Sequence, residues 1–117
     1  MSFYPCPCCG RLVHEVPPGS FRICPVCGWE DNLAQLRWPG VSGANRRSLV
    51  EAQRLYQEVG VADPVFVPKV RLPDRSWPME DGFRAVIPEV DEFEPDGVMG
   101  VEWPEGRTQL YWWRPHF

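Results

Sequence analysis

The chain has 117 residues, and its apolar fraction of 44% and charged fraction of 24% are those of a folded protein. Its formal net charge of −4 disfavours a general nucleic-acid binder, because the phosphate backbone selects basic protein surfaces. We expect no membrane span, since no run approaches about 18 apolar residues, and a cytoplasmic location, since the N-terminus does not have the charged and apolar regions of a secretory signal.

All five cysteines lie within the first 27 residues, as CPCCG at residues 6–10 and CPVCG at residues 24–28. Both runs follow the pattern C-P-x-C-G. In this pattern proline fixes φ, glycine permits a tight turn, and two cysteines three apart direct their sulfurs to one point. Between the runs, residues 12–16 and 21–23 read as two strands joined by the turn PPGS. The sequence therefore predicts a zinc-ribbon β-hairpin with a cysteine pair at each foot.

The spacing of the cysteines predicts a metal site with four sulfur ligands, Cys6, Cys9, Cys24 and Cys27. A tetrahedral set of four thiolates suits zinc, and iron is the alternative that the same ligands accept. An odd number of cysteines without an export signal argues against a set of disulfides. Cys8 belongs to neither pair. We interpret it as a small residue beside the metal, with a redox-sensitive thiol that displaces a ligand as the alternative.

Residues 45–59 predict one amphipathic helix. Its apolar face consists of Leu49, Ala52, Tyr56 and Val59. Two residues compete to cap its start: Asn45, and Ser48, which forms a capping box with Glu51. Gly60 follows the last turn, where glycine commonly ends a helix.

The second half of the chain, residues 61–117, predicts a proline-rich β extension that packs on a first unit formed by residues 1–60. Prolines between residues 64 and 78 indicate an extended crossing. Residues 83–87 read as a strand, and residues 98–103 and 108–113 read as a hairpin. The predicted fold class is therefore small α+β, with a zinc-ribbon hairpin, one helix and a C-terminal hairpin.

Acidic residues are concentrated between residues 80 and 96, where seven acids accompany one base. Aromatic residues flank this stretch, and interfaces often combine aromatic anchors with charge steering. We therefore predict a partner-binding surface made of Trp77, Glu80, Asp81, Asp91, Glu92, Glu94 and Asp96.

The run CPCCG, the run ICPVCGWED and the segment GANRRSLVEAQRLYQEVG resemble the bacterial cysteine-rich CPCC family. The residues that carry the resemblance are 23–31, 43–45, Ser48, Leu49, Glu51, Ala52, Tyr56 and Gly60. The chain departs from the family pattern at Asn32, Ser42 and Leu55. The resemblance covers about residues 3–60. It implies metal binding without an established enzymatic activity, and some small bacterial proteins of this kind accompany toxins as immunity partners.

These observations favour a non-enzymatic zinc-binding module that binds a protein, with an immunity or regulatory partner of a basic bacterial toxin as the expected role. An enzyme is disfavoured because the chain has no Ser-His-Asp order, no glycine-rich phosphate loop and no HExxH motif. We expect no small-molecule substrate. One alternative is a nucleic-acid-binding ribbon that uses Arg11, Arg22, Arg46 and Arg47. The other is a rubredoxin-like electron carrier.

Overall fold

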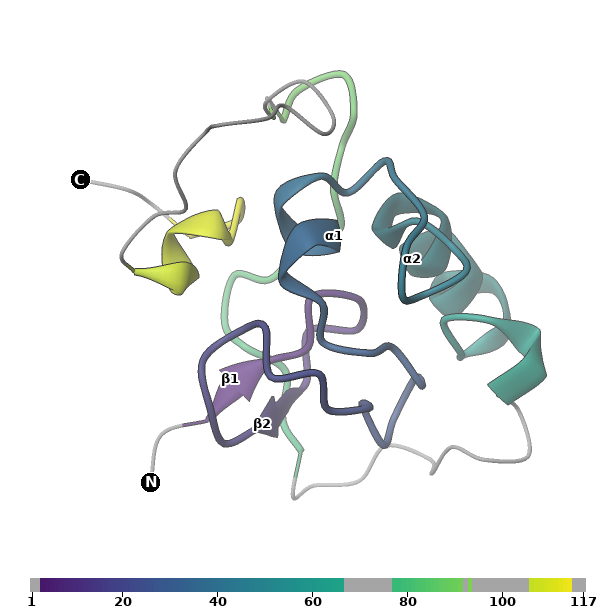
Figure 1. Cartoon of the computed structure of the whole chain (residues 1–117), viewed down its shortest axis with the longest axis horizontal. Coiled ribbons are helices and arrows are strands. Elements are labelled where there is room, and N and C mark those ends of the chain that lie inside the picture. The colour runs from purple at the N-terminus through teal and green to yellow at the C-terminus, as the bar shows by residue number, and fades with distance from the viewer. Residues whose placement is uncertain (1–2, 67–76, 92, 94–105, 115–117) are drawn as a thin grey trace.

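The structure is a computed structural model that describes residues 3–66, 77–91, 93 and 106–114. Its regular elements are short, and Figure 1 shows a small β layer below α1, with α2 beside both. The elements are β1 (Tyr4–Pro5), β2 (Leu12–His14), α1 (Leu33–Arg37), α2 (Leu49–Val59), and the 3-10 helices η1 (Pro64–Phe66) and η2 (Arg107–Leu110). Among the described residues, no helix has the length and apolar character needed to cross a membrane.

The predicted pairing of residues 12–16 with residues 21–23 is wrong. β2 instead pairs antiparallel with β1 on the other side of the first cysteine turn, with Tyr4 opposite His14. In the same way Ile23 forms a bridge with Glu30 across the second cysteine turn. Each C-P-x-C-G turn thus closes a short antiparallel pairing of its own, because the turn reverses the chain between the residues on its two sides.

The predicted helix over residues 45–59 is confirmed as α2, but it begins at Leu49 rather than at residue 45. The Ser48 hydroxyl accepts a hydrogen bond from the Glu51 backbone N–H at 3.2 Å, so Ser48 rather than Asn45 is the N-cap. Gly60 has φ of 82° and donates its N–H to the Tyr56 carbonyl, which closes the last turn. The side chain of Asn45 bonds to the backbone of Glu30 instead.

Replacing Ser48 by alanine is expected to lower the free energy of unfolding by about 1 kcal/mol, because the Glu51 N–H loses its acceptor. Urea unfolding of the variant measures this change. Ser42→Ala is the matched control, since Ser42 is exposed and caps no helix. An equal effect of both substitutions would contradict the capping role.

α1 is an element that the sequence analysis did not predict. Asn32 is its N-cap, and its Oδ1 accepts a hydrogen bond from the Gln35 backbone N–H at 2.9 Å. Leu36 packs its side chain into the core, 1% exposed. The helix ends just before Pro39. At five residues, it is too short for an apolar period to reveal it.

The C-terminal predictions are largely wrong within the described residues. Residues 83–87 form no strand, and residues 64–66 are the 3-10 helix η1 rather than extended chain. The predicted strand at 108–113 is η2 followed by a turn, and its partner, residues 98–103, lies outside the described residues. Tyr111 is in the core, and Trp112 and Trp113 both pack against it. A strand would direct neighbouring side chains to opposite faces, so it does not suit this aromatic run.

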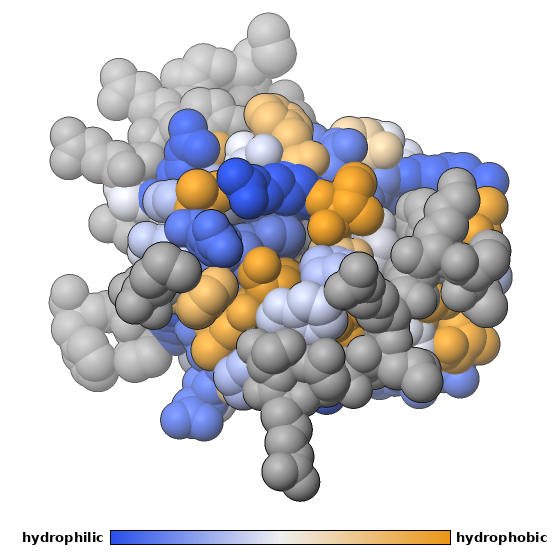
Figure 2. Space-filling model, turned by 90° about the horizontal axis from the view of Figure 1, so that it is seen from below, coloured by the Kyte–Doolittle hydropathy of each residue, from blue (hydrophilic) through white to orange (hydrophobic). Residues whose placement is uncertain are grey.

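One core joins the two halves of the chain. The cysteines pack with apolar side chains from α1, α2 and the C-terminal segment, and the cluster consists of Cys6, Cys8, Cys9, Cys24, Val26, Cys27, Trp29, Leu36, Leu49, Ala52, Ala62 and Tyr111. Figure 2 shows that apolar residues also reach the surface, in several places between polar ones. The cysteines therefore lie at the centre of the fold rather than on its edge.

Candidate metal centre

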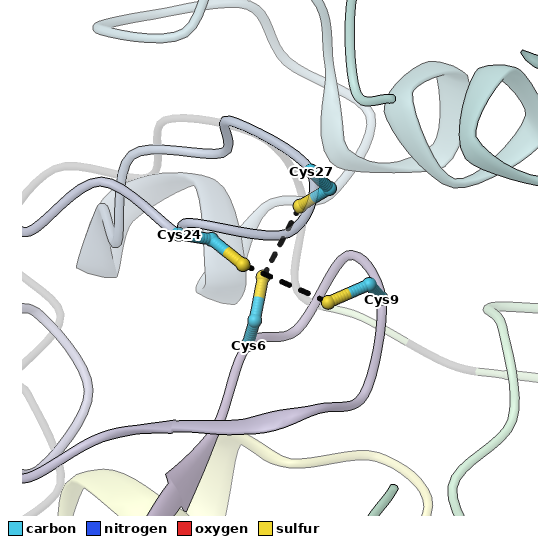
Figure 3. Close-up of side chains that lie close together, drawn as sticks. All are labelled: Cys6, Cys9, Cys24 and Cys27. Atoms are coloured by element: carbon cyan, nitrogen blue, oxygen red, sulfur yellow. Dashed lines mark hydrogen bonds between the residues drawn. The ribbon is translucent and has the colours of Figure 1, made fainter. Parts of the chain in front are cut away.

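The side chains of Cys6, Cys9, Cys24 and Cys27 point toward one another from two separate turns (Figure 3). Their Sγ atoms all lie within 4.8 Å of one another. The Sγ atoms of Cys6 and Cys27 are 3.6 Å apart, and those of Cys9 and Cys24 are 3.7 Å apart. A tetrahedron around an ion with metal–sulfur distances of about 2.3 Å has edges of about 3.8 Å. The spacing of the sulfurs thus fits a tetrahedral ion.

The two turns that hold these cysteines have the same backbone design. The Gly10 N–H donates to the Cys6 carbonyl at 2.7 Å, and the Gly28 N–H donates to the Cys24 carbonyl at 2.9 Å. Gly10 and Gly28 have φ of 79° and 88°, a conformation that side chains disfavour. The glycine of each C-P-x-C-G run is therefore needed to fold the chain back after the second cysteine.

The four sulfurs are free thiols rather than disulfides, because S–S bonds are about 2.05 Å long and these sulfurs are much farther apart. Each of the four residues is at most 1% exposed. Burial raises the pKa of the Cys6 and Cys27 thiols, while hydrogen bonds from Cys27, Cys6 and Cys9 lower the pKa of Cys24. Without a cation, burial thus disfavours the ionisation of several of these thiols at once. A bound cation would allow all four sulfurs to be thiolates.

Hydrogen bonds from neighbouring groups hold the two turns in place. The Val26 N–H lies 3.4 Å from the Cys24 sulfur and donates to it. Gln53, on α2, donates its side-chain amide to the Pro7 carbonyl at 2.9 Å. The Ala62 N–H donates to the Cys27 carbonyl at 2.8 Å. These contacts hold the sulfurs in place through the backbone and do not use the sulfurs themselves, apart from Cys24.

Cys8 lies beside this cluster but does not belong to the group of four sulfurs. Its side chain is 3% exposed, and burial raises the pKa of its thiol. The structure thus places Cys8 as a small buried neighbour of the centre, as the sequence analysis interprets it.

Comparison with known proteins bears directly on this cysteine cluster. The family model described as "Cysteine-rich CPCC" matches residues 4–76, which is more than half of the chain. The chain belongs to the cysteine-rich CPCC family. A search of curated proteins finds no match to the chain. All four clustered cysteines lie in the part that the family model matches, and the C-terminal segment lies beyond it.

In this CPCC protein, two described members of the predicted acidic surface are paired with cations or donors of the chain itself. Glu80 accepts hydrogen bonds from Trp113 and Arg114, and Asp91 pairs with Arg84 at 2.6 Å. Trp77 is half-buried and packs against the core, whereas Asp81 is exposed. The remaining members, Glu92, Glu94 and Asp96, lie outside the described residues.

Asp91 gives this region a pH dependence. The Arg84 guanidinium and the Ile87 N–H donate to its carboxylate, and the guanidinium holds the pKa of Asp91 below its ordinary value. This stabilisation is present above the unfolded pKa of about 3.9 and is lost as the pH falls through the folded value. Asp91→Asn is expected to lower the free energy of unfolding by about 1–2 kcal/mol at pH 7. The loss is expected to be the same at pH 6 and pH 8, because both the folded and the unfolded pKa of Asp91 lie below this range.

Denaturant unfolding of the wild type and the variant at pH 6 and pH 8 measures the difference between them, and both pH values avoid the acid that would protonate metal-binding sulfurs. Asp81→Asn is the matched control, because Asp81 is exposed. If Asp91→Asn cost no more than Asp81→Asn, the pair with Arg84 would not be a source of stability.

The arginines of the nucleic-acid alternative are mostly engaged within the protein. Arg46 and Arg47 share Asp63, at 2.8 Å and 3.4 Å, and Arg47 also pairs with Glu51 at 3.0 Å. Burial works to raise the pKa of Asp63, but the Val65 N–H and the two guanidinium groups lower it overall. Arg11 donates to the Trp77 carbonyl at 3.3 Å, and Arg22 is exposed. Of the four arginines of this alternative, Arg46, Arg47 and Arg11 thus have partners within the protein, and Arg22 is exposed.

A set of buried amides that the sequence pattern does not reveal holds the chain around the two cysteine turns. Asn45 accepts a hydrogen bond from the Glu30 N–H and donates to the Glu30 carbonyl, both at 2.8 Å. Gln35 accepts from the Asn45 N–H at 2.9 Å and donates to the Val41 carbonyl at 3.0 Å. Gln53 could have been noticed, because it lies four residues after Leu49 on the apolar face of α2. A polar residue on an apolar face needs a buried partner.

Proposed function

We propose that this CPCC protein is a non-enzymatic zinc-binding module that interacts with another protein, and that its zinc is structural. The observation that carries the proposal is the closed set of four buried sulfurs at tetrahedral spacing. Structural zinc sites have four protein ligands, whereas catalytic ones keep a position open for water or substrate. Four cysteine ligands leave no such position.

Zinc is favoured over iron by the burial of the ligands. An electron carrier must bring its metal close to a partner, but each of the four sulfurs belongs to a residue at most 1% exposed. The ligands must also stay reduced, which agrees with a cytoplasmic location. Protein purified without chelators under reducing conditions is expected to contain one zinc per chain and to be colourless. A red, iron-loaded protein would overturn the choice of zinc, and no metal at all would overturn the whole proposal.

A protein partner is supported by exposed apolar side chains near the second cysteine turn. Phe21 is 67% exposed and has φ of 63°, a conformation rare for a large side chain, and Ile23 is 58% exposed. Strained backbone at an exposed aromatic residue suggests a functional constraint. The net charge of −4 and the exposed acids Asp81 and Glu89 favour a basic partner, such as a toxin that this protein would neutralise.

The test is a native mass spectrum of the protein isolated from its own host, compared with the variant Phe21→Ser. The expected result is a complex with a basic protein that dissociates as salt rises and that the variant does not form. Val90→Ser is the matched control, since Val90 is equally exposed and lies in a turn far along the chain. Nucleic acid in place of a protein, or no complex at low salt, would overturn this part of the proposal.

A further inference from the structure

The metal centre is closed to solvent, so an ion can enter or leave only after a covering segment moves. The four ligand residues are at most 1% exposed, and Cys8 beside them is 3% exposed. A chelator has to reach the ion or a sulfur in order to compete for the metal. The rate of metal exchange is therefore set by the opening of whichever cover opens most easily.

The segment of residues 77–83, named here the strap, lies against the chain that follows the first cysteine turn. The Leu12 N–H donates to the Pro78 carbonyl at 2.8 Å, and the Glu80 N–H donates to the Gly10 carbonyl at 2.9 Å. Arg11 and Met79 form an antiparallel bridge between these two bonds. The strap thus lies as an added strand along the chain that leaves the first cysteine turn.

At the end of the strap, the ring of Phe83 lies directly against the cysteine turn. A Cβ built on Gly10 would be only 2.4 Å from a carbon of this ring. On its other side the ring makes an edge-on contact with Trp113, with 4.8 Å between the ring centroids. Phe83 therefore fills the space beside the Gly10 backbone and connects it to the C-terminal aromatic residues.

The buried side-chain amide of Gln53 connects α2 both to the first cysteine turn and to the chain after the strap. Gln53 is 3% exposed, and its Nε2 donates to the Pro7 carbonyl while its Oε1 accepts from the Val86 N–H, both at 2.9 Å. Pro7 lies between two cysteines of the first turn, and Val86 follows the strap by three residues. The cysteine turn and the chain after the strap thus share one polar anchor.

α2, which contacts the first cysteine turn through Gln53, is held more firmly than the strap. α2 is an 11-residue helix capped at both ends, and its Leu49 and Ala52 are 0% exposed. The strap is held by two backbone hydrogen bonds to the turn and by the bonds of Glu80 to the C-terminal segment, but none of its residues is fully buried. The strap has the weaker attachment, so it is expected to open at a lower free energy.

We propose that the strap is the gate of the metal centre: its detachment from Gly10 and Leu12 sets how fast zinc is released and taken up. This inference rests on the proposed zinc binding. It assigns a role to a segment outside residues 4–76, the part that the CPCC family model matches.

The test measures the release of zinc from the loaded full-length protein into excess EDTA. Phe83→Ala removes the ring that seats the end of the strap beside Gly10, and it is expected to raise the release rate about tenfold. Ile87→Ala is the matched control, because Ile87 lies four residues after Phe83 and is 42% exposed. Equal release rates for wild type, Phe83→Ala and Ile87→Ala would overturn the gate.

Hydrogen exchange of the zinc-loaded wild type decides the same question without a substitution, and it serves if Phe83→Ala does not fold. The Glu80 amide, bonded to the Gly10 carbonyl, is expected to exchange at least about tenfold faster than the Gly28 amide, bonded to the Cys24 carbonyl. Equal protection of the two amides would overturn the gate. A protein that takes up no zinc would overturn the proposed function and, with it, this inference.

Discussion

Cys24→Ser is expected to abolish stoichiometric zinc binding and to leave the chain unfolded at room temperature, whereas Cys8→Ser keeps both the metal and the fold. Structural zinc sites contribute about 10–16 kcal/mol at neutral pH, which is comparable to the whole stability of a small domain. Cys24 is one of the four clustered sulfurs, and Cys8 is not. Both residues are buried, so the pair compares ligand loss with a similar change in packing.

Far-ultraviolet circular dichroism and zinc analysis of the two variants measure this difference. Removal of zinc from the wild type by a chelator is expected to reproduce the unfolded state of Cys24→Ser, and adding zinc back refolds only the wild type. A folded Cys24→Ser variant without metal would mean that the apolar core is sufficient by itself. An unfolded Cys8→Ser variant would mean that Cys8 has more than a packing role.

The grouping of the four sulfurs could be predicted because it depends on local geometry repeated twice. A C-P-x-C-G run brings its own two sulfurs together through one glycine in the left-handed region, as Gly10 and Gly28 show. The partners of the strands could not be predicted in the same way. Residues 12–16 and 21–23 both have strand character, but the pattern does not say that the first of them pairs back across the cysteine turn with β1.

The polar supports of the centre were missed for a related reason. Asn45 is of a residue type that commonly caps helices. Only the folded chain shows that its side-chain amide bonds to the backbone of Glu30 instead. Likewise Gln53 bonds to Pro7, which is 46 residues away in the sequence. Buried amides often bond to partners that are distant in the sequence. Their residue type therefore predicts that a hydrogen bond forms, but it does not identify the partner.

The C-terminal segment shows where strand patterns mislead. Three consecutive aromatic residues suggest a strand, yet Tyr111 stacks on Trp113 at 4.6 Å and Trp112 meets Trp113 edge-on at 4.7 Å between ring centroids. Contact among all three rings is more favourable here than the alternation of a sheet. These rings pack on Phe83 and against the core. Because Phe83 is the last residue of the strap, this packing keeps the strap close to the cysteine turn.

Gly10→Ala is expected to lower the free energy of unfolding of the zinc-loaded protein by about 2–5 kcal/mol, and Gly82→Ala by about 1–2 kcal/mol. Both glycines have φ near 80°, so both substitutions carry the same left-handed strain. They differ in the space around the added methyl group. At Gly82 it meets nothing within 4 Å, and at Gly10 it meets the ring of Phe83 at 2.4 Å. The extra loss at Gly10 is the cost of overpacking, about 1–3 kcal/mol.

A double-mutant cycle with Phe83→Ala separates the clash from the strain. Removing the ring makes room for the methyl group, so Gly10→Ala in that background is expected to cost only as much as Gly82→Ala. The chelator release rate of Gly10→Ala should rise as well, because the displaced ring can no longer seat the strap on the cysteine turn. If the two glycine substitutions cost the same in the wild-type background, Phe83 does not lie on Gly10. The strap would then lose its main apolar contact with the metal centre.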